Sequence, residues 1–151
     1  MRHMATPPTP SPPAPATTAA SWASLRFWGI LLLVFFVLTS TVGGSLALES
    51  SYLAVTLASH IGLALVTLGL GGYATSFVGR SYKAMPRGFA GLCALSALGA
   101  TIAGTIYLLG GQAAGALDAM EAFALIGILA ALLMIVFGGP SQRRVSVAPP
   151  S

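Results

Sequence analysis

The sequence predicts an all-α membrane protein, an up-down bundle of four transmembrane helices with both termini in the cytoplasm. The first observation is a set of four apolar runs, at about 25–46, 53–78, 89–109 and 119–137. A helix needs about 20 apolar residues to cross a hydrocarbon core of ~30 Å, so each run is long enough to span. The second observation is composition, because 56% of the residues are hydrophobic and only 7% are charged, whereas about 25% of a soluble domain is charged.

The third observation is that cations and carboxylates flank opposite ends of the runs. The seven cations precede the first run, separate the second from the third, or follow the fourth: Arg2, Arg26, Arg80, Lys83, Arg87, Arg143 and Arg144. The three carboxylates, Glu49, Asp118 and Glu121, lie near the other ends. Basic loops stay in the cytoplasm, which predicts a multi-pass protein of the cytoplasmic membrane with both termini inside. The net charge of +4 therefore does not indicate a nucleic-acid partner, since no soluble basic face carries it. The expected partner is the lipid bilayer.

We divide the chain into three parts. Residues 1–24 are rich in Pro, Ala, Ser and Thr, which predicts a disordered cytoplasmic tail. Residues 25–138 form the membrane domain, and residues 139–151 form a C-terminal cytoplasmic tail. The first run has an alternative interpretation as a signal peptide cleaved after Ala47, but its apolar character continues to Leu46, which favours a retained helix.

The short connections predict antiparallel neighbours. In the inner connection, 79–87, we expect Pro86 to end one helix before the next begins. In the outer connection, 110–118, we expect Asp118 to be the N-cap of the fourth helix and Glu121, three residues later, to complete a capping box. The alternative for these two carboxylates is proton or ion binding.

Small residues recur at helical spacing in three of the runs. Lipid tails give helices no hydrophobic reason to associate, so small residues that permit close approach indicate packing faces. The expected packing residues are Ser96, Ala100 and Gly104 in the third run and Gly127 and Ala131 in the fourth, with Gly62 and Gly69 in the second. One of these faces is alternatively a surface for self-association or for another membrane subunit.

His60 is the unusual residue of the apolar runs. It lies about eight residues from the outer boundary, about 12 Å deep, where an ionisable side chain marks a functional position by default. We expect it in a polar layer with Thr39, Ser40, Thr56, Thr101 and Thr105. Three roles remain open: a structural histidine that fixes helix register, a ligand for a cofactor or metal, and a proton-relay or substrate contact.

The segment SHIGLALVTLGLGGYA, residues 59–74, resembles the His-bearing helices of membrane b-type cytochromes and of the half-bundles of haem A synthase. The whole chain resembles small four-helix prokaryotic integral membrane proteins. The haem resemblance covers one helix of four, and it implies b-type haem with His60 as an axial ligand. Those families place two His ligands around each haem, whereas no second His lies in a run of this chain. Met120 is a chemically possible second ligand, expected about 10 Å nearer the outer boundary, and a dimer that pairs two His60 side chains is the alternative.

Three functions follow from these observations. The leading hypothesis is a non-catalytic integral membrane subunit, an accessory or assembly component of a larger complex, because the sequence has no Ser–His–Asp set and no Cys and His at zinc spacing. The second is an electron-transfer subunit that handles b-type haem or quinone at His60. The third is a small oligomeric channel or carrier whose path is lined by the polar layer.

Overall fold

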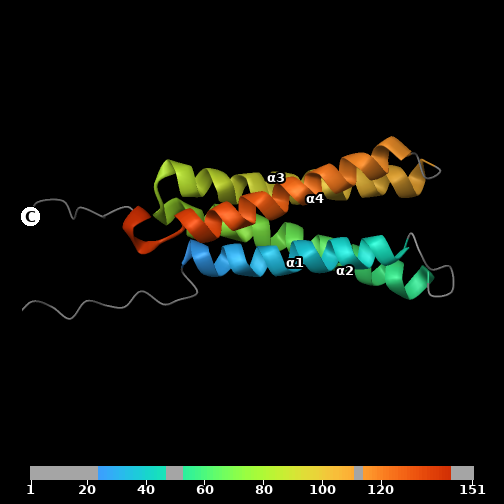
Figure 1. Cartoon of the computed structure of the whole chain (residues 1–151), viewed down its shortest axis with the longest axis horizontal. Helices are drawn as coiled ribbons and strands as arrows, with labels where there is room; N and C mark the ends of the chain where they lie inside the picture. Colours follow the sequence, from blue (N-terminus) through green and yellow to red (C-terminus); the bar gives the residue numbers. More distant parts are fainter. Residues whose placement is uncertain (1–23, 47–52, 111–113, 144–151) are drawn as a thin grey trace, which may run out of the picture.

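The computed structural model describes residues 24–46, 53–110 and 114–143. It consists of the helices α1 (Leu25–Leu46), α2 (Leu53–Tyr73), α3 (Ala84–Leu109) and α4 (Ala114–Phe137). The prediction of an all-helical chain with four helices long and apolar enough to cross a membrane is confirmed. Successive helices run in opposite directions (Figure 1), so the last residues of α1 and α3 and the first residues of α2 and α4 lie at one end of the bundle. The predicted tails, apart from a few residues beside α1 and α4, lie outside the described residues.

Two predicted helix starts were wrong. The helices α3 and α4 begin at Ala84 and Ala114, five residues before the predicted 89 and 119. Pro86 is the third residue of α3 and does not end a helix, because the first turn has no intrahelical partner for a backbone N–H and therefore tolerates proline. Asp118 is not an N-cap, since it lies in the second turn of α4, where its side chain is exposed.

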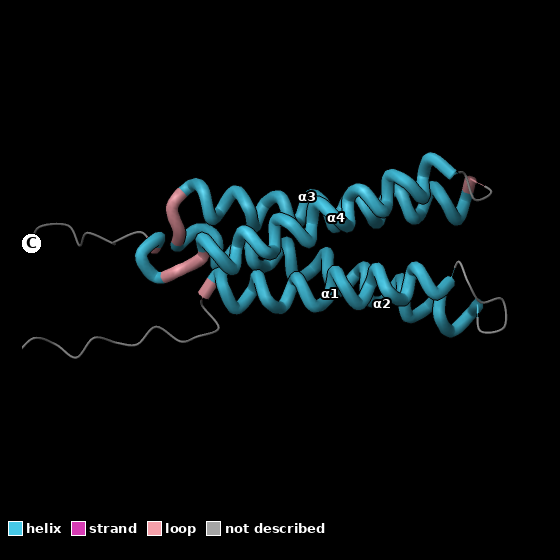
Figure 2. Tube along the Cα trace, viewed as in Figure 1, coloured by secondary structure: helices cyan, strands magenta, loops and turns pink. Residues whose placement is uncertain are grey.

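The connection between α2 and α3 is itself largely helical. The second span continues past Tyr73 as a π-helical turn, Ala74–Val78, and a 3₁₀ turn, Gly79–Ser81. Tyr82 and Lys83 are extended, and Lys83 is the N-cap residue of α3. Another 3₁₀ turn, Pro140–Gln142, follows α4 (Figure 2).

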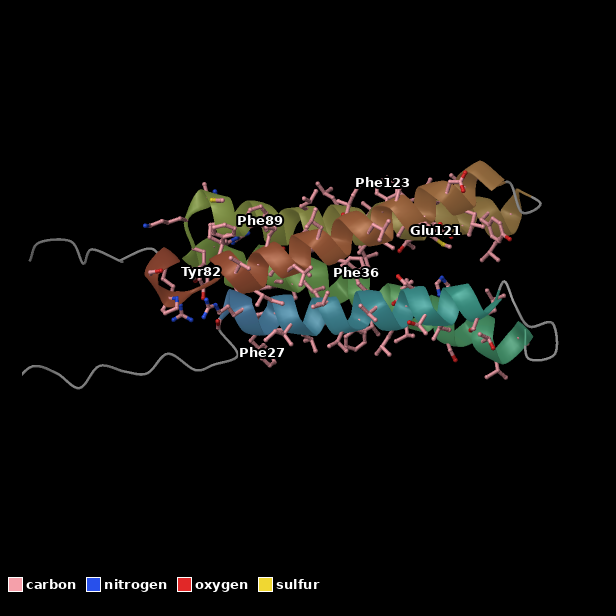
Figure 3. The ribbon with its side chains drawn as sticks, in the orientation of Figure 1. Phe27, Phe36, Tyr82, Phe89, Glu121 and Phe123 are labelled. Atoms are coloured by element: carbon pink, nitrogen blue, oxygen red, sulfur yellow. The ribbon has the colours of Figure 1, made fainter. Side chains whose placement is uncertain are left out.

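One end of the bundle, which we call the closed end, is held together by Tyr82 (Figure 3). Its side chain is completely buried, and its hydroxyl oxygen accepts hydrogen bonds from the Leu25 backbone N–H and the Arg143 Nε–H, both at 3.1 Å. The Arg26 Nε–H donates to the Ile135 carbonyl at 2.9 Å. These bonds join the start of α1, the connection before α3 and the segment after α4. The closed end is therefore fixed by polar contacts as well as by packing.

The hydrophobic core lies in the half of the bundle next to the closed end. Its buried residues come from the first half of α1 and α3, from the turns that follow α2, and from the second half of α4; they include Leu25, Leu32, Phe36, Tyr82, Cys93 and Met134. In the other half, towards what we call the open end, the α1–α2 and α3–α4 hairpins diverge (Figure 1). The fold thus combines one packed half with one separated half.

The predicted packing residues divide between these two halves. In the packed half Ser96 is buried and Ala131 is completely buried, and a Cβ built on Gly127 would overlap the Phe36 ring. In the separated half Ala100 and Gly104 line cavities. The expectation that Gly62 and Gly69 pack against another helix of the chain was wrong, because a Cβ on either would meet nothing within 4 Å.

Candidate cofactor site

Two adjoining cavities occupy the space between the diverging hairpins. The first chamber, about 370 Å³, lies mainly between α1 and α4, and the second chamber, about 440 Å³, lies mainly between α2 and α3. Both volumes fall within the range of about 300–1,000 Å³ that is usual for ligand pockets. The chambers share seven lining residues, which we call the slot: Gly43, His60, Ala64, Ala100, Thr101, Leu117 and Met120.

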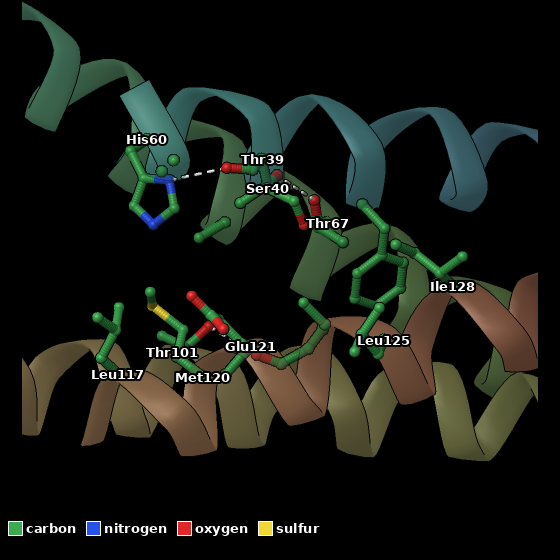
Figure 4. Close-up of a pocket in the computed structure, with 17 residues that line it drawn as sticks. Thr39, Ser40, His60, Thr67, Thr101, Leu117, Met120, Glu121, Leu125 and Ile128 are labelled. Atoms are coloured by element: carbon green, nitrogen blue, oxygen red, sulfur yellow. Dashed lines mark hydrogen bonds between the residues drawn. The ribbon is translucent and has the colours of Figure 1, made fainter. Parts of the chain in front are cut away.

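His60 projects from α2 into the slot with one ring nitrogen already engaged (Figure 4). Its Nδ1 lies 3.0 Å from the backbone carbonyl oxygen of Thr39 on α1. A carbonyl oxygen only accepts hydrogen bonds, so Nδ1 must carry the hydrogen. In the neutral imidazole, Nε2 therefore holds the free lone pair. Nε2 makes no hydrogen bond within the described part of the chain and lies on the side of the ring that faces α4.

Gly43 gives the imidazole the room that this arrangement requires. A Cβ built on Gly43 would lie 2.7 Å from the His60 Cε1 and 3.1 Å from Nδ1. Contacts that short would force the ring to move, so the absence of a side chain at Gly43 allows the imidazole to pack against α1. Thr39 connects the same two helices a second time, because its Oγ1 lies 3.4 Å from that of the buried Thr67.

The opposite wall of the slot carries Met120 from α4 (Figure 4). A Cβ built on Gly104 of α3 would lie 3.4 Å from the Met120 sulfur, so the absence of a side chain there leaves space beside the thioether. The expected depth difference of about 10 Å between His60 and Met120 was wrong. His60 is the eighth residue of α2 and Met120 the seventh of α4, which places both about 10 Å from the open ends of their helices. The cause is the early start of α4.

The structure brings most of the predicted polar layer together. Thr39, Ser40 and Thr101 line the first chamber, and Thr105 lines the second. Thr56 is half-buried and lines neither chamber.

Glu121 was not predicted to face His60. It lines the first chamber from α4, on the same helical face as Leu117, Ala124 and Ile128, which recur at spacings of three and four residues. That periodicity is visible in the sequence, but a helix start at 119 assigned the carboxylate to a cap.

The comparisons with known proteins identify no relative. No protein-family model, no curated protein and no solved structure matches the chain. The donor atoms that face the slot are the Nε2 of His60 and the sulfur of Met120.

Those donor atoms suit a metal that is held mainly by a macrocycle. Within residues 24–46, 53–110 and 114–143 no group of three His, Cys, Asp or Glu side chains is placed to hold a bare metal ion. Haem iron needs only one or two protein ligands, because the porphyrin supplies the remaining four nitrogens. An imidazole nitrogen and a thioether sulfur on opposite walls of an apolar slot match this requirement.

Proposed function

We propose that the chain is a non-catalytic integral membrane subunit of a larger complex, and that it carries a b-type haem with His60 as an axial ligand. The observation that supports this proposal most directly is the hydrogen bond from His60 Nδ1 to the Thr39 carbonyl. A metal-bound histidine almost always donates its other ring N–H to a carbonyl, a carboxylate or water, which fixes the tautomer and the ring orientation. In His60 that outer bond already exists, and the coordinating nitrogen faces a cavity.

Met120 would be the second residue to hold the haem. It lies on the facing helix at the same depth, and it lines both chambers as His60 does. A thioether is a neutral, soft ligand that favours ferrous iron, so a histidine–methionine pair raises the reduction potential of a haem. A bound haem would supply one-electron chemistry, and the chain would supply ligation, orientation and exclusion of water.

A quinol is the second candidate for the same site. With Nδ1 donating to Thr39, the neutral His60 ring can accept a hydrogen bond at Nε2 but cannot donate one there. Glu121, on the facing wall, is also an acceptor when ionised. Two acceptors on opposite walls suit the two hydroxyl groups of a quinol better than the two carbonyl groups of a quinone.

We also propose that the closed end faces the cytoplasm of a cell whose cytoplasmic membrane the protein spans. The described cations Arg26, Arg80, Lys83, Arg87 and Arg143 all belong to segments at the closed end, whereas Asp118 and Glu121 lie near the start of α4 at the open end. The positive-inside rule then supports two cytoplasmic termini and a haem site in the outer half of the membrane.

A haem titration with matched variants tests the assignment. Haem b added to the purified full-length protein should give a saturable Soret shift that His60→Ala abolishes. Thr56→Ala is the control, because Thr56 lies one helical turn before His60 but outside both chambers. Met120→Ala should still bind haem b, but its spectrum should become that of a haem held by His60 alone. Equal haem binding by the wild type and His60→Ala would overturn the proposal. A rise in the unfolding midpoint of the protein with an added quinol, but not with haem b, would favour the second candidate.

A further inference from the structure

The second chamber extends away from His60 between α2 and α3. Haem ligation does not explain this extension. Its outer boundary consists of aliphatic side chains that face out of the bundle. Leu65 is 56% exposed, Leu108 is 48% exposed and Leu109 is 84% exposed. In a membrane such side chains contact hydrocarbon, so the chamber opens onto the lipid.

The chamber is elongated along the helix axes. Its lining residues extend on α3 from Ala100 to Leu109 and on α2 from Leu57 to Leu65. At 1.5 Å per residue these stretches are about 13 Å and 12 Å long. The chamber thus begins at the open end of α3 and passes His60 to the level of Leu65, about 8 Å deeper along α2, parallel to the direction that lipid chains take in a bilayer.

Water is a poor occupant of this space. The Thr101 hydroxyl already donates to the Ala97 carbonyl at 2.7 Å, and the Thr105 hydroxyl donates to the Thr101 carbonyl at 2.8 Å. His60 and Tyr107 are the other polar side chains of the lining, and the rest is apolar. A buried water needs two to four polar partners, so these groups are too few for water to fill a chamber of about 440 Å³. An empty chamber is also unfavourable, because its walls would lose their dispersion contacts. Hydrocarbon from the bilayer needs no polar partners, and it restores the dispersion contacts that an empty chamber would lose.

We propose that one acyl chain of a phospholipid, from the leaflet at the open end, occupies the second chamber. A phospholipid places its head group at the interface, level with the end of α3, and its chain along the bilayer normal, which matches the start and direction of the chamber. The acyl chain would then close the lipid-facing side of the slot beside Leu117 and Met120 and keep water away from His60. This proposal does not require haem.

Two substitutions in the lining of the second chamber test the proposal against a matched control. Thr105→Trp and Leu65→Trp place a large ring in the chamber from α3 and from α2 respectively. Ile106→Trp is the control, because Ile106 is adjacent to Thr105, is 54% exposed and lines neither chamber. The full-length proteins would be purified in mild detergent, checked for native helicity by circular dichroism, and analysed by native mass spectrometry for retained phospholipid.

We expect the wild type and Ile106→Trp to retain a phospholipid. Each chamber variant should retain it at least about tenfold more weakly, because the new ring would occupy the space of the acyl chain. A phospholipid with a photoreactive group at mid-chain should crosslink the wild type at Leu57–Leu65 or Thr101–Leu108. Absence of retained lipid, equal retention by all variants, or crosslinks confined to other segments would overturn the proposal. Retention of an isoprenoid lipid in place of a phospholipid would also overturn it.

Discussion

Replacing Gly43 by alanine should displace the His60 ring and weaken haem binding. The new Cβ would lie 2.7 Å from Cε1, and ordinary contact begins near 3.4 Å, so the ring must move by about 0.7 Å or the helices must separate by that amount. A movement of this size directed away from α1 stretches the 3.0 Å bond from Nδ1 to the Thr39 carbonyl to about 3.7 Å, beyond hydrogen-bonding distance. Loss of the bond costs about 0.5–1.5 kcal/mol, and loss of an outer contact to a metal-bound histidine typically lowers metal affinity about 10–100-fold.

Gly69→Ala is the matched control for this experiment. A Cβ on Gly69 meets nothing within 4 Å and Gly69 lines neither chamber, and both substitutions gain the same helix propensity of about 0.8–1.0 kcal/mol. The difference between the two variants therefore reports the contact with His60. We would measure thermal unfolding without haem and the affinity for haem b from the Soret titration. Gly43→Ala should be less stable than Gly69→Ala and should bind haem more weakly. Equal stability and equal affinity would refute the argument that Gly43 positions the imidazole.

Three further predictions concern the packed half and the orientation. Tyr82→Phe removes the acceptor for Leu25 and Arg143 and should destabilise the fold by about 1–3 kcal/mol, whereas Tyr107→Phe should leave the unfolding midpoint equal to that of the wild type within experimental error. Equal effects of the two substitutions would show that the closed end does not depend on the Tyr82 hydroxyl. Gly127→Ala should destabilise by about 1–3 kcal/mol through overlap with Phe36, and Gly62→Ala, which meets no neighbour, should not, as thermal unfolding would show. In a Cys93→Ala background, a cysteine at Ser51 should react with an impermeant thiol reagent added outside intact cells and one at Ser81 should not; the reverse pattern would invert the proposed orientation.

Much of the fold could be predicted because each span is a long apolar run, which length and hydropathy identify without tertiary information. The two incorrect helix starts arose at residue types that occur both at a helix boundary and within the first turns of a helix. Proline ends one helix or occupies the first turn of the next, and Pro86 does the latter. Aspartate caps a helix or lies within it, and Asp118 lies within it. Local sequence does not decide between these alternatives.

The candidate site was only partly predictable for a related reason. His60 was evident from its chemistry, since it is the ionisable residue deep in an apolar run. Its partner on α1 is a backbone carbonyl, and every residue has one, so no sequence signal identifies Thr39 as the acceptor. The position of Met120 opposite His60 depends on where α4 begins, and the predicted start was five residues too late. The two chambers depend on the angle between the hairpins, which the closed-end contacts of Tyr82 help to fix.

The absorption spectrum of the protein purified from its native membranes tests the central claim most directly. The spectrum would be recorded for the wild type and for His60→Ala, each before and after reduction with dithionite. The haem proposal predicts a Soret band with sharpened bands of a b-type haem on reduction in the wild type, and their loss in His60→Ala, whose helical content should be unchanged. A colourless wild-type protein that is folded and remains colourless after incubation with haem b would contradict it.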